Sequence, residues 1–370
     1  MKKVGIITFH ASHNYGSMLQ AYALQQVVLN MGYQCEIINF RTKRQKQMFY
    51  PDYCKGTIFE RMKKLIVQFP HIKEAWHKYI LFEKFLQSDL ILSEHEYGTI
   101  KELEQGKLDY DYYISGSDQI WNTDCFDFDI AYYLPFAHSG KLIAYAPSMG
   151  PTPEKSKSLN IDITHLLERY YKIGVREPDT ANFIHKVFNG EVSTVIDPTL
   201  LLSPSHWQSL ITTDSIIKGD YIFVYSPKFK SFEEGYKMAE DISERYKMKV
   251  VLSRNHKYLC EKRRWNRFVI KADIGPKEFI NLIKNARLVC CDSFHAVVFS
   301  IIFQVPFLVI DGMEDSRISN LLKMARLENR SIKSNQDFDD AIFEPLSFKH
   351  MEILQPYIGR SFDFLKSALS

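Results

Sequence analysis

The sequence predicts an α/β protein made of two doubly wound domains, each built on a parallel sheet. Short runs rich in β-branched residues alternate with longer segments of helical periodicity, which is the pattern of βαβ units. The alternation occurs twice along 370 residues, a length that exceeds one ordinary domain and supports two hydrophobic cores. Residues 197–205, with two prolines and a polar capping residue, separate the two series and place the domain boundary near residue 200.

The first series predicts an N-terminal domain at residues 1–200. Its predicted strands are Lys3–Thr8, Cys35–Asn39, Tyr110–Ser115, Leu142–Ala146, Ile173–Arg176 and Val192–Ile196. Helices are predicted at Met18–Met31, which Gly32 ends, and at Pro178–Phe188, which carries proline in its first turn. From 41 to 106 the strand signal fades and helical stretches such as 59–69 and 74–86 remain, so we expect a helical insertion there.

The second series predicts a C-terminal domain at residues 201–345. Its predicted strands are Tyr221–Tyr225, Lys249–Leu252, Phe268–Ile270, Leu288–Cys291 and Phe307–Ile310, and its predicted helices are Phe232–Tyr246, Pro276–Asn285 and Phe294–Gln304. Residues 346–370 predict a last helix, Phe348–Leu369, which we expect to pack back on the first domain. Doubly wound sheets bind ligands at the carboxyl ends of their strands, so the expected active site is a cleft shared by both sheets.

Charge and cysteine content narrow the expected environment. The 47 Lys and Arg residues nearly balance 44 Asp and Glu, so the net charge of +3 does not indicate nucleic acid or an anionic membrane as the main partner. The six cysteines form no CxxC pair, which fits a reduced cytoplasm. The apolar run at the N-terminus is too short for a signal peptide, and no run reaches the length of a membrane-spanning helix. We therefore expect a cytoplasmic protein with no transmembrane segment.

Several common cofactor motifs are missing from the sequence. It contains no GxGxxG, no P-loop, no HExxH and no Cys/His cluster with metal-ligand spacing. These gaps weigh against dinucleotide, kinase and zinc-hydrolase functions, and we expect neither a cofactor nor a metal. Two basic stretches, 41–46 and 254–267, either grip a nucleotide or polyanion or form solvated loops.

The turn Asn14-Tyr15-Gly16-Ser17 joins the first predicted strand to the first helix. Gly16 permits a tight turn, and the N–H groups at a helix N-terminus bind an anion or a sugar hydroxyl. Asn14 and Gly16 are therefore candidate ligand-binding residues. The alternative is an ordinary turn in which Ser17 caps the helix. We expect the nearby His10 and His13 to face solvent.

The segment Ser115–Asn122 follows a predicted strand with more polar side chains than a turn requires. Trp121 offers an apolar face for a pyranose ring, with Gln119 and Asn122 as polar neighbours. Asp118 is a candidate base for a sugar hydroxyl. In the alternative interpretation Asp118 caps a helix and Trp121 belongs to the core.

Two further strand ends carry candidate residues. Arg176 would point its planar guanidinium into the cleft, where it suits a carboxylate or phosphate, or else it pairs with Glu177 or Asp179 at the surface. Ser293 is a good helix cap, and His295 falls in the first helical turn, a position suited to handling anions. The alternative for His295 is a hydrogen-bonded core residue.

Six segments, in order, resemble the polysaccharide pyruvyl transferase family. They are GIITFHASHNYGSMLQAYALQ, ISGSDQIWN, IAYAPSMG, GVREPDT, VIDPTLLL and CCDSFHAVVFSIIFQVPFLVI, within a match from about residue 3 to 327. The resemblance implies a GT-B-like fold of two facing Rossmann-like domains, and we expect the acceptor side in the first and the donor side in the second. It also implies transfer of pyruvate from phosphoenolpyruvate to a saccharide or lipid-linked glycan as a ketal, in capsule, exopolysaccharide or cell-wall biosynthesis.

The resemblance also assigns roles to residues. His295 matches the family's acid/base histidine, Arg176 matches an arginine that grips the anionic donor, and Asp118 lies in the matching acidic loop. Many family members carry arginine two residues before the histidine, where this chain has Ser293. We expect Asn14, Gly16 and Ser293 to contact the donor. We also expect a second cation, and Arg317 is the candidate unless it pairs with Glu314 or Asp315. A nucleotide-sugar glycosyltransferase and a non-catalytic glycan-binding protein remain alternative functions.

Overall fold

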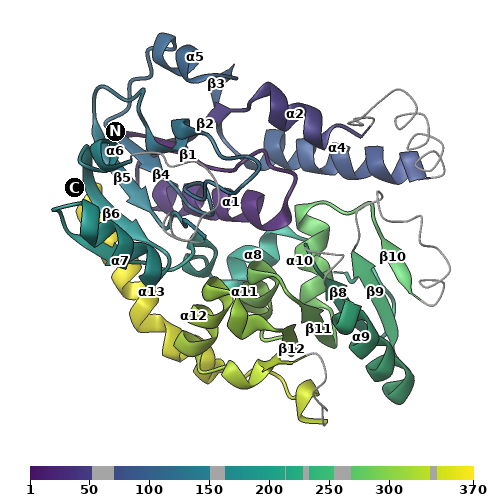
Figure 1. Cartoon of the computed structure of the whole chain (residues 1–370). Helices are drawn as coiled ribbons and strands as arrows, with labels where there is room; N and C mark the ends of the chain where they lie inside the picture. Colours follow the sequence, from purple (N-terminus) through teal and green to yellow (C-terminus); the bar gives the residue numbers. More distant parts are fainter. Residues whose placement is uncertain (52–70, 151–162, 213, 228–232, 254–267, 334–339) are drawn as a thin grey trace. The chain divides into compact units, whose positions relative to one another are not determined.

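The computed structural model describes residues 1–51, 71–150, 163–212, 214–227, 233–253, 268–333 and 340–370 (Figure 1). The chain divides into two units. Unit 1 comprises Met1–Met48, Lys84–Leu202 and Gln355–Ser370, and unit 2 comprises Phe49–Glu83 and Ser203–Leu354. The helix predicted at 59–69 and the basic stretch at 254–267 lie outside the described residues.

Unit 1 is built on a parallel sheet that has seven strands within the described residues, in the order β3-β2-β1-β4-β5-β6-β7. The strands are β1 (Lys3–Ile7), β2 (Gln34–Phe40), β3 (Leu92–Tyr97), β4 (Tyr112–Ser115), β5 (Lys141–Tyr145), β6 (Tyr170–Val175) and β7 (Val192–Thr194). The inner strands are short apolar runs that are buried almost throughout, as expected for a parallel sheet covered on both faces.

Helices follow the strands of unit 1 as crossover connections. They are α1 (Tyr15–Asn30), α2 (Lys43–Phe49), α5 (Ile100–Gln105), α6 (Thr164–Leu167) and α7 (Pro178–Val187), with 3₁₀ turns at η2 (Ile130–Tyr133) and η3 (Pro198–Leu201). α4 (Ile72–Asp89) contributes residues to both units. Nearly all of α1 is buried, which explains its weak amphipathic pattern in the sequence.

Unit 2 repeats this plan on a second parallel sheet, with six strands among the described residues in the order β10-β9-β8-β11-β12-β13. The strands are β8 (Tyr221–Tyr225), β9 (Lys249–Ser253), β10 (Val269–Lys271), β11 (Leu288–Cys291), β12 (Phe307–Ile310) and β13 (Ser331–Ile332). The helices are α8 (Pro204–Leu210), α9 (Glu233–Tyr246), α10 (Pro276–Lys284), α11 (Phe294–Phe303) and α12 (Ser316–Ala325), with 3₁₀ turns at η6 (Gly312–Glu314), η7 (Glu328–Arg330) and η8 (Asp340–Phe343). Both sheets are therefore doubly wound, as predicted.

The last helix, α13 (Phe348–Ala368), returns the end of the chain to unit 1 (Figure 1). The Ile196 amide donates to Ser361 Oγ over 3.0 Å, and the Tyr33 hydroxyl donates to the Leu369 carbonyl over 2.6 Å. Phe364 lies against β6, where a Cβ atom on Gly174 would come within 2.8 Å of its ring. The helix thus completes the core of unit 1 from a position far along the sequence.

The structure also departs from the sequence predictions within 41–106. Residues Leu92–Tyr97 form a strand, β3, at the edge of the first sheet, where only helix and loop were predicted. Its sequence, LSEHEY, is polar, and the side chains from Glu94 to Glu96 are exposed. Edge strands commonly carry charged side chains of this kind. No helix in the described part of the chain is long and apolar enough to cross a membrane.

Candidate active site

The first candidate site lies between β1 and β4, where the order in which successive strands are added to the sheet of unit 1 reverses. β1 and β4 are adjacent, with Ile7 paired to Ser115. The chain winds from β1 to β2 on one side and from β4 to β5 on the other. The loops that follow β1 and β4 therefore lead to opposite sides of the sheet, and open α/β sheets commonly bind ligands at such reversal points.

Asn14 organises the turn that follows β1. Its Oδ1 accepts hydrogen bonds from the Gly16 and Ser17 amides over 3.0 and 3.3 Å, so Asn14 caps α1. The alternative in which Ser17 is the cap was wrong. Ser17 Oγ donates instead to Asp118 Oδ2 over 2.6 Å and so joins the loops that follow β1 and β4.

Asp118 is held in an uncommon backbone conformation in the loop after β4. Its φ is 73°, a region that asparagine and aspartate tolerate better than most residues. Gly116, with φ 140°, is required two residues earlier, because a Cβ atom there would lie 1.9 Å from the Tyr145 carbonyl oxygen. This loop presents the Asp118 carboxylate to both Ser17 and Arg176.

Arg176 follows β6 and is buried, with 4% of its surface exposed. Its Nε donates to Glu177 Oε1 over 2.7 Å and its Nη1 to Asp197 Oδ2 over 2.8 Å, while Nη2 lies 3.8 Å from Asp118 Oδ1. Burial lowers the pKa of Arg176, but the three carboxylates outweigh it and raise this pKa above its ordinary value. The pairing with Glu177 is thus present, although it is buried rather than at the surface.

Trp121, Gln119 and Asn122 lie farther along the same loop. Trp121 is 1% exposed, stacks on Tyr133 with ring centroids 4.9 Å apart, and donates from Nε1 to Ser115 Oγ over 3.1 Å. Asn122 Nδ2 donates to Gln119 Oε1 over 3.0 Å. This environment favours the core alternative for Trp121, and an acceptor-binding role for the three residues stays a prediction.

The second candidate site lies at the corresponding reversal in unit 2. β8 and β11 are adjacent, with Tyr225 paired to Cys291, and the chain winds outward on both sides of them. Ser293 follows β11 and caps α11 by accepting from the Ala296 amide, as predicted. His295 occupies the first turn of α11, is 8% exposed, and lies edge to face with Phe294 at 5.1 Å between ring centroids.

Arg317 follows β12, the next strand of the same sheet. Its Nε and Nη2 donate to the two carboxylate oxygens of Asp315 over 3.0 and 2.6 Å. The pairing with Asp315 that the sequence left open is therefore present, with 20% of the Arg317 side chain exposed.

A third cluster, which sequence analysis missed, joins three segments at the strand ends of unit 1. Ser12 Oγ donates to Asp127 Oδ2 over 2.5 Å, and Gln45 Nε2 donates to Ser12 Oγ over 3.1 Å and to Asp127 Oδ2 over 3.3 Å. Burial raises the pKa of Asp127, the two hydrogen bonds lower it, and the charge of Asp118 raises it further. No sequence motif could have revealed this cluster, because its three residues are far apart in the chain.

The structure also shows the surroundings of His10 and of the basic stretch 41–46. His10 is buried rather than solvent-facing, and its ring nitrogens contact the Thr8 carbonyl and Asn39 Oδ1 at 3.1 Å each. Burial lowers the pKa of His10. In the basic stretch 41–46, Arg41 and Lys46 pair with Glu96, and Arg44 lies over the Phe126 ring.

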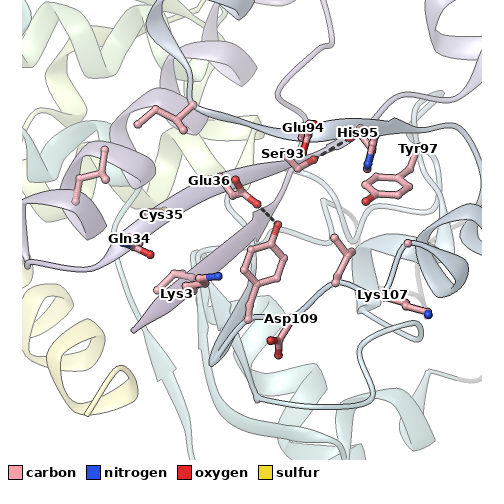
Figure 2. A pocket seen from close by; sticks show the side chains of 16 residues that line it. Lys3, Gln34, Cys35, Glu36, Ser93, Glu94, His95, Tyr97, Lys107 and Asp109 are labelled. Carbon is pink, nitrogen blue, oxygen red and sulfur yellow. Dashed lines mark hydrogen bonds between the residues drawn. The ribbon is translucent and has the colours of Figure 1, made fainter. Parts of the chain in front are cut away.

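A separate pocket of about 560 Å³ opens where β1 and β2 begin, and Lys3, Glu36 and Tyr110 help to line it. The Tyr110 hydroxyl donates a hydrogen bond to Glu36, which Figure 2 shows among the side chains of this pocket. None of the predicted site residues lines this pocket. Among the described residues, no group of three or more His, Cys, Asp or Glu side chains could hold a metal ion.

Solved structures share the fold of this chain at low sequence identity. A putative UDP-N-acetylglucosamine 2-epimerase from Listeria monocytogenes is 12% identical with a TM-score of 0.55, covering 99% of this chain and 95% of its own. The S. aureus MnaA–UDP structure is 11% identical with a TM-score of 0.52, covering 99% and 98%. An alpha-glucosyltransferase in complex with UDP and DNA is 10% identical with a TM-score of 0.53, covering 99% of each chain. These likenesses establish a GT-B-like fold of two Rossmann-like sheets.

Sequence comparison identifies the family. No curated protein matches the chain. The family model for polysaccharide pyruvyl transferase matches residues 14–312, which include Asn14, Asp118, Arg176 and His295. Because the match covers most of the sequence and both strand-end sites, the chain belongs to the polysaccharide pyruvyl transferase family.

Proposed function

We propose that the chain transfers pyruvate from phosphoenolpyruvate to a saccharide as a ketal, in the biosynthesis of a surface glycan. The observation that carries this proposal is the family match across residues 14–312. The family name implies a saccharide acceptor, and we propose that this saccharide is free or part of a lipid-linked glycan. The chemistry needs a proton donor for the enol, a site for two anionic groups, and a base for the attacking hydroxyl.

His295 is proposed as the proton donor to the methylene carbon of phosphoenolpyruvate. It lies in the first turn of α11, next to the backbone N–H groups of this turn that Ser293 does not cap. Such N–H groups favour an anion beside the histidine. Ser293 thus provides a helix-terminus contact where many relatives have an arginine.

Asp118 is proposed as a base for the acceptor hydroxyl. Its carboxylate stands at the reversal point of the first sheet, and its Oδ2 accepts from Ser17. Because Asn14 holds the amides of Gly16 and Ser17, the turn before α1 fixes the position of this hydrogen bond. A fixed carboxylate loses little orientational freedom when a hydroxyl binds it.

Arg176 and Arg317 are proposed to hold the two anionic groups of the donor. Arg317 is the more accessible, with 20% of its side chain exposed against 4% for Arg176. An incoming phosphate or carboxylate could replace Asp315 as the partner of Arg317. Arg176 is paired with Glu177 and Asp197, and it would hold the donor by exchanging one of these carboxylates for a donor oxygen.

Calorimetry with phosphoenolpyruvate and with a panel of UDP-sugars tests the proposal. We expect phosphoenolpyruvate to bind, and Arg317→Gln to weaken this binding by about 1.5–3 kcal/mol, the scale of a charged hydrogen bond. The matched control is Lys323→Gln, a lysine farther along α12. Binding of a UDP-sugar without phosphoenolpyruvate would support a glycosyltransferase, and binding of neither would support a glycan-binding protein.

A further inference from the structure

The cluster of Ser12, Gln45 and Asp127 has the features of a binding subsite. Ser12 lies in the loop after β1, Gln45 in α2 after β2, and Asp127 in the loop after β4. All three therefore stand at the ligand-binding edge of the first sheet. The Arg44 guanidinium, 5.0 Å above the Phe126 ring, gives α2 a second attachment to the same loop.

Two acceptor atoms in the cluster are buried without a donor. Gln45 Oε1 and Asp127 Oδ1 have no hydrogen-bond partner within the described part of the chain. Gln45 is only 3% exposed, so its carbonyl oxygen is shielded from bulk solvent, and a donor reaches it only from a group that enters between the three segments. Leaving a buried acceptor unsatisfied costs about 1–3 kcal/mol, and native structures rarely do so without a reason.

The hydrogen bonds around Ser12 fix which way the Gln45 amide points. The Ser12 hydroxyl hydrogen is directed to Asp127 Oδ2, so Gln45 must present its NH₂ group to the Ser12 oxygen. Gln45 Oε1 is consequently turned away from this contact. A ligand that brings hydroxyl donors would satisfy both remaining oxygens.

We propose that Gln45 Oε1 and Asp127 Oδ1 receive hydroxyl groups of the acceptor saccharide, and that Asp127 takes the proton of one hydroxyl as its oxygen attacks. This inference rests on the proposed function. A saccharide fits because it presents neighbouring hydroxyl groups as donors, whereas phosphoenolpyruvate offers mainly acceptor oxygens to these two acceptors. Asp127 is then a catalytic residue in addition to Asp118.

Ketal formation gives a chemical reason for two carboxylates. Two C–O bonds form to C2 of the pyruvyl group, so two acceptor O–H bonds break. One proton is added to the methylene carbon and turns it into a methyl group. The other proton leaves with the phosphate when the bond between C2 and the phosphate oxygen breaks. Asp118 and Asp127 would each remove one hydroxyl proton. Burial, which raises the pKa of Asp127, makes its carboxylate a stronger base than an exposed aspartate.

The variants Asp127→Asn and Gln45→Met test the subsite. Asparagine keeps the shape of the side chain and an oxygen for Ser12 and Gln45, so a purely structural role predicts little change. Asp124→Asn is the matched control, since Asp124 is an exposed aspartate of the same loop. Thermal melting of each variant establishes that the fold is retained.

The first measurement is saturation-transfer NMR with methyl α-D-mannopyranoside, methyl β-D-galactopyranoside and methyl β-D-glucopyranoside as probes. We expect at least one glycoside to bind the wild type and Asp124→Asn, and to lose at least about tenfold in affinity in Gln45→Met, the effect of one hydrogen bond of about 1.4 kcal/mol. Failure of all three probes to bind the wild type, or equal binding to all variants, would overturn the inference.

The second measurement is ketal formation from phosphoenolpyruvate with the bound glycoside. We expect Asp127→Asn to slow kcat by about 10²- to 10⁴-fold, the contribution of a general base. A wild type that forms ketal and an equally active Asp127→Asn would overturn the inference and leave the proposed function standing. A wild type that binds glycoside through Gln45 but does not consume phosphoenolpyruvate would instead refute the proposed function while supporting the subsite.

Discussion

The guanidinium of Arg176 is surrounded by carboxylates and has almost no contact with water. Glu177 and Asp197 accept its hydrogen bonds, and Asp118 lies within 3.8 Å. The side chain of Asp197 is fully buried, and the side chain of Glu177 is 4% exposed. Removing one member of such a group leaves the others charged in a medium that solvates them poorly.

Replacing this arginine should therefore affect folding as well as ligand binding. We expect Arg176→Gln to lower the free energy of unfolding by about 3–5 kcal/mol, the cost of breaking a buried ion pair. Urea denaturation measures it, with Lys101→Gln on the exposed face of α5 as a control that should change stability by no more than about 0.5 kcal/mol. An unchanged free energy of unfolding would mean that water hydrates the carboxylates in the Arg176→Gln variant.

His295 offers a cleaner test of chemistry, because the proposed role is a single proton transfer. We expect His295→Ala to slow turnover of phosphoenolpyruvate by about 10²- to 10⁴-fold if the ring is a general acid. His185→Ala, at an exposed position on α7, is the control that should retain activity. Near wild-type turnover by a folded His295→Ala variant would remove the assignment.

At the scale of elements, burial decides what the sequence predicts well. β1, β4 and β5 are continuous apolar runs and were predicted to within two residues at either end. β3 was missed because an edge strand exposes one side and tolerates charged residues such as Glu94 and Glu96. The spacing of hydrophobic residues reflects which face of a segment is buried. It therefore does not predict the secondary structure of a segment that is mostly exposed.

The contact between α13 and β6 gives a prediction at the same scale. A Cβ atom on Gly174 would lie 2.8–3.1 Å from ring atoms of Phe364, so we expect Gly174→Ala to destabilise the protein by about 1–3 kcal/mol through overpacking. Phe364→Leu in the same chain should recover part of this loss. Chemical denaturation of the single and double variants measures both effects.

Gly359, in the same helix, is the matched control. It is exposed, and a Cβ atom there would meet no atom within 4 Å. Gly359→Ala should therefore stabilise the protein by about 0.5–1 kcal/mol, because alanine loses less backbone entropy in a helix. A stabilisation by Gly174→Ala as large as that by Gly359→Ala would show that the loss of backbone entropy in the unfolded chain, and not the contact with Phe364, controls the response at Gly174.

At the scale of the whole molecule, topology explains which parts of the site the sequence could reveal. Asp118, Arg176 and His295 each follow a buried strand, so the pattern of strands alone puts them at a ligand-binding edge. The contacts of Ser12 with Gln45 and Asp127 join residues 33 and 115 positions apart. Only the folded sheet brings such positions together, and no local pattern in the sequence records them.

The same topology makes unit 1 dependent on the end of the chain. Ile358, Phe364, Leu365 and Leu369 are each at most 9% exposed, and burying four such side chains contributes on the order of 10 kcal/mol. That amount is comparable to the entire net stability of a typical domain, which is about 5–15 kcal/mol. Unit 1 should therefore fail to fold stably when residues 355–370 are removed, even though its sheet is complete.

Hydrogen exchange of the full chain and of a chain ending at Leu354 measures this dependence strand by strand. We expect the truncated chain to lose amide protection in β5 and β6 of unit 1, while β8 and β11 of unit 2 keep theirs. A full-length variant with Gln355→Ala and Arg360→Ala, both at exposed positions of α13, should exchange like the wild type. Persistent protection of β5 and β6 after truncation would mean that their own packing holds the first sheet together, because amides exchange only as fast as their hydrogen bonds open.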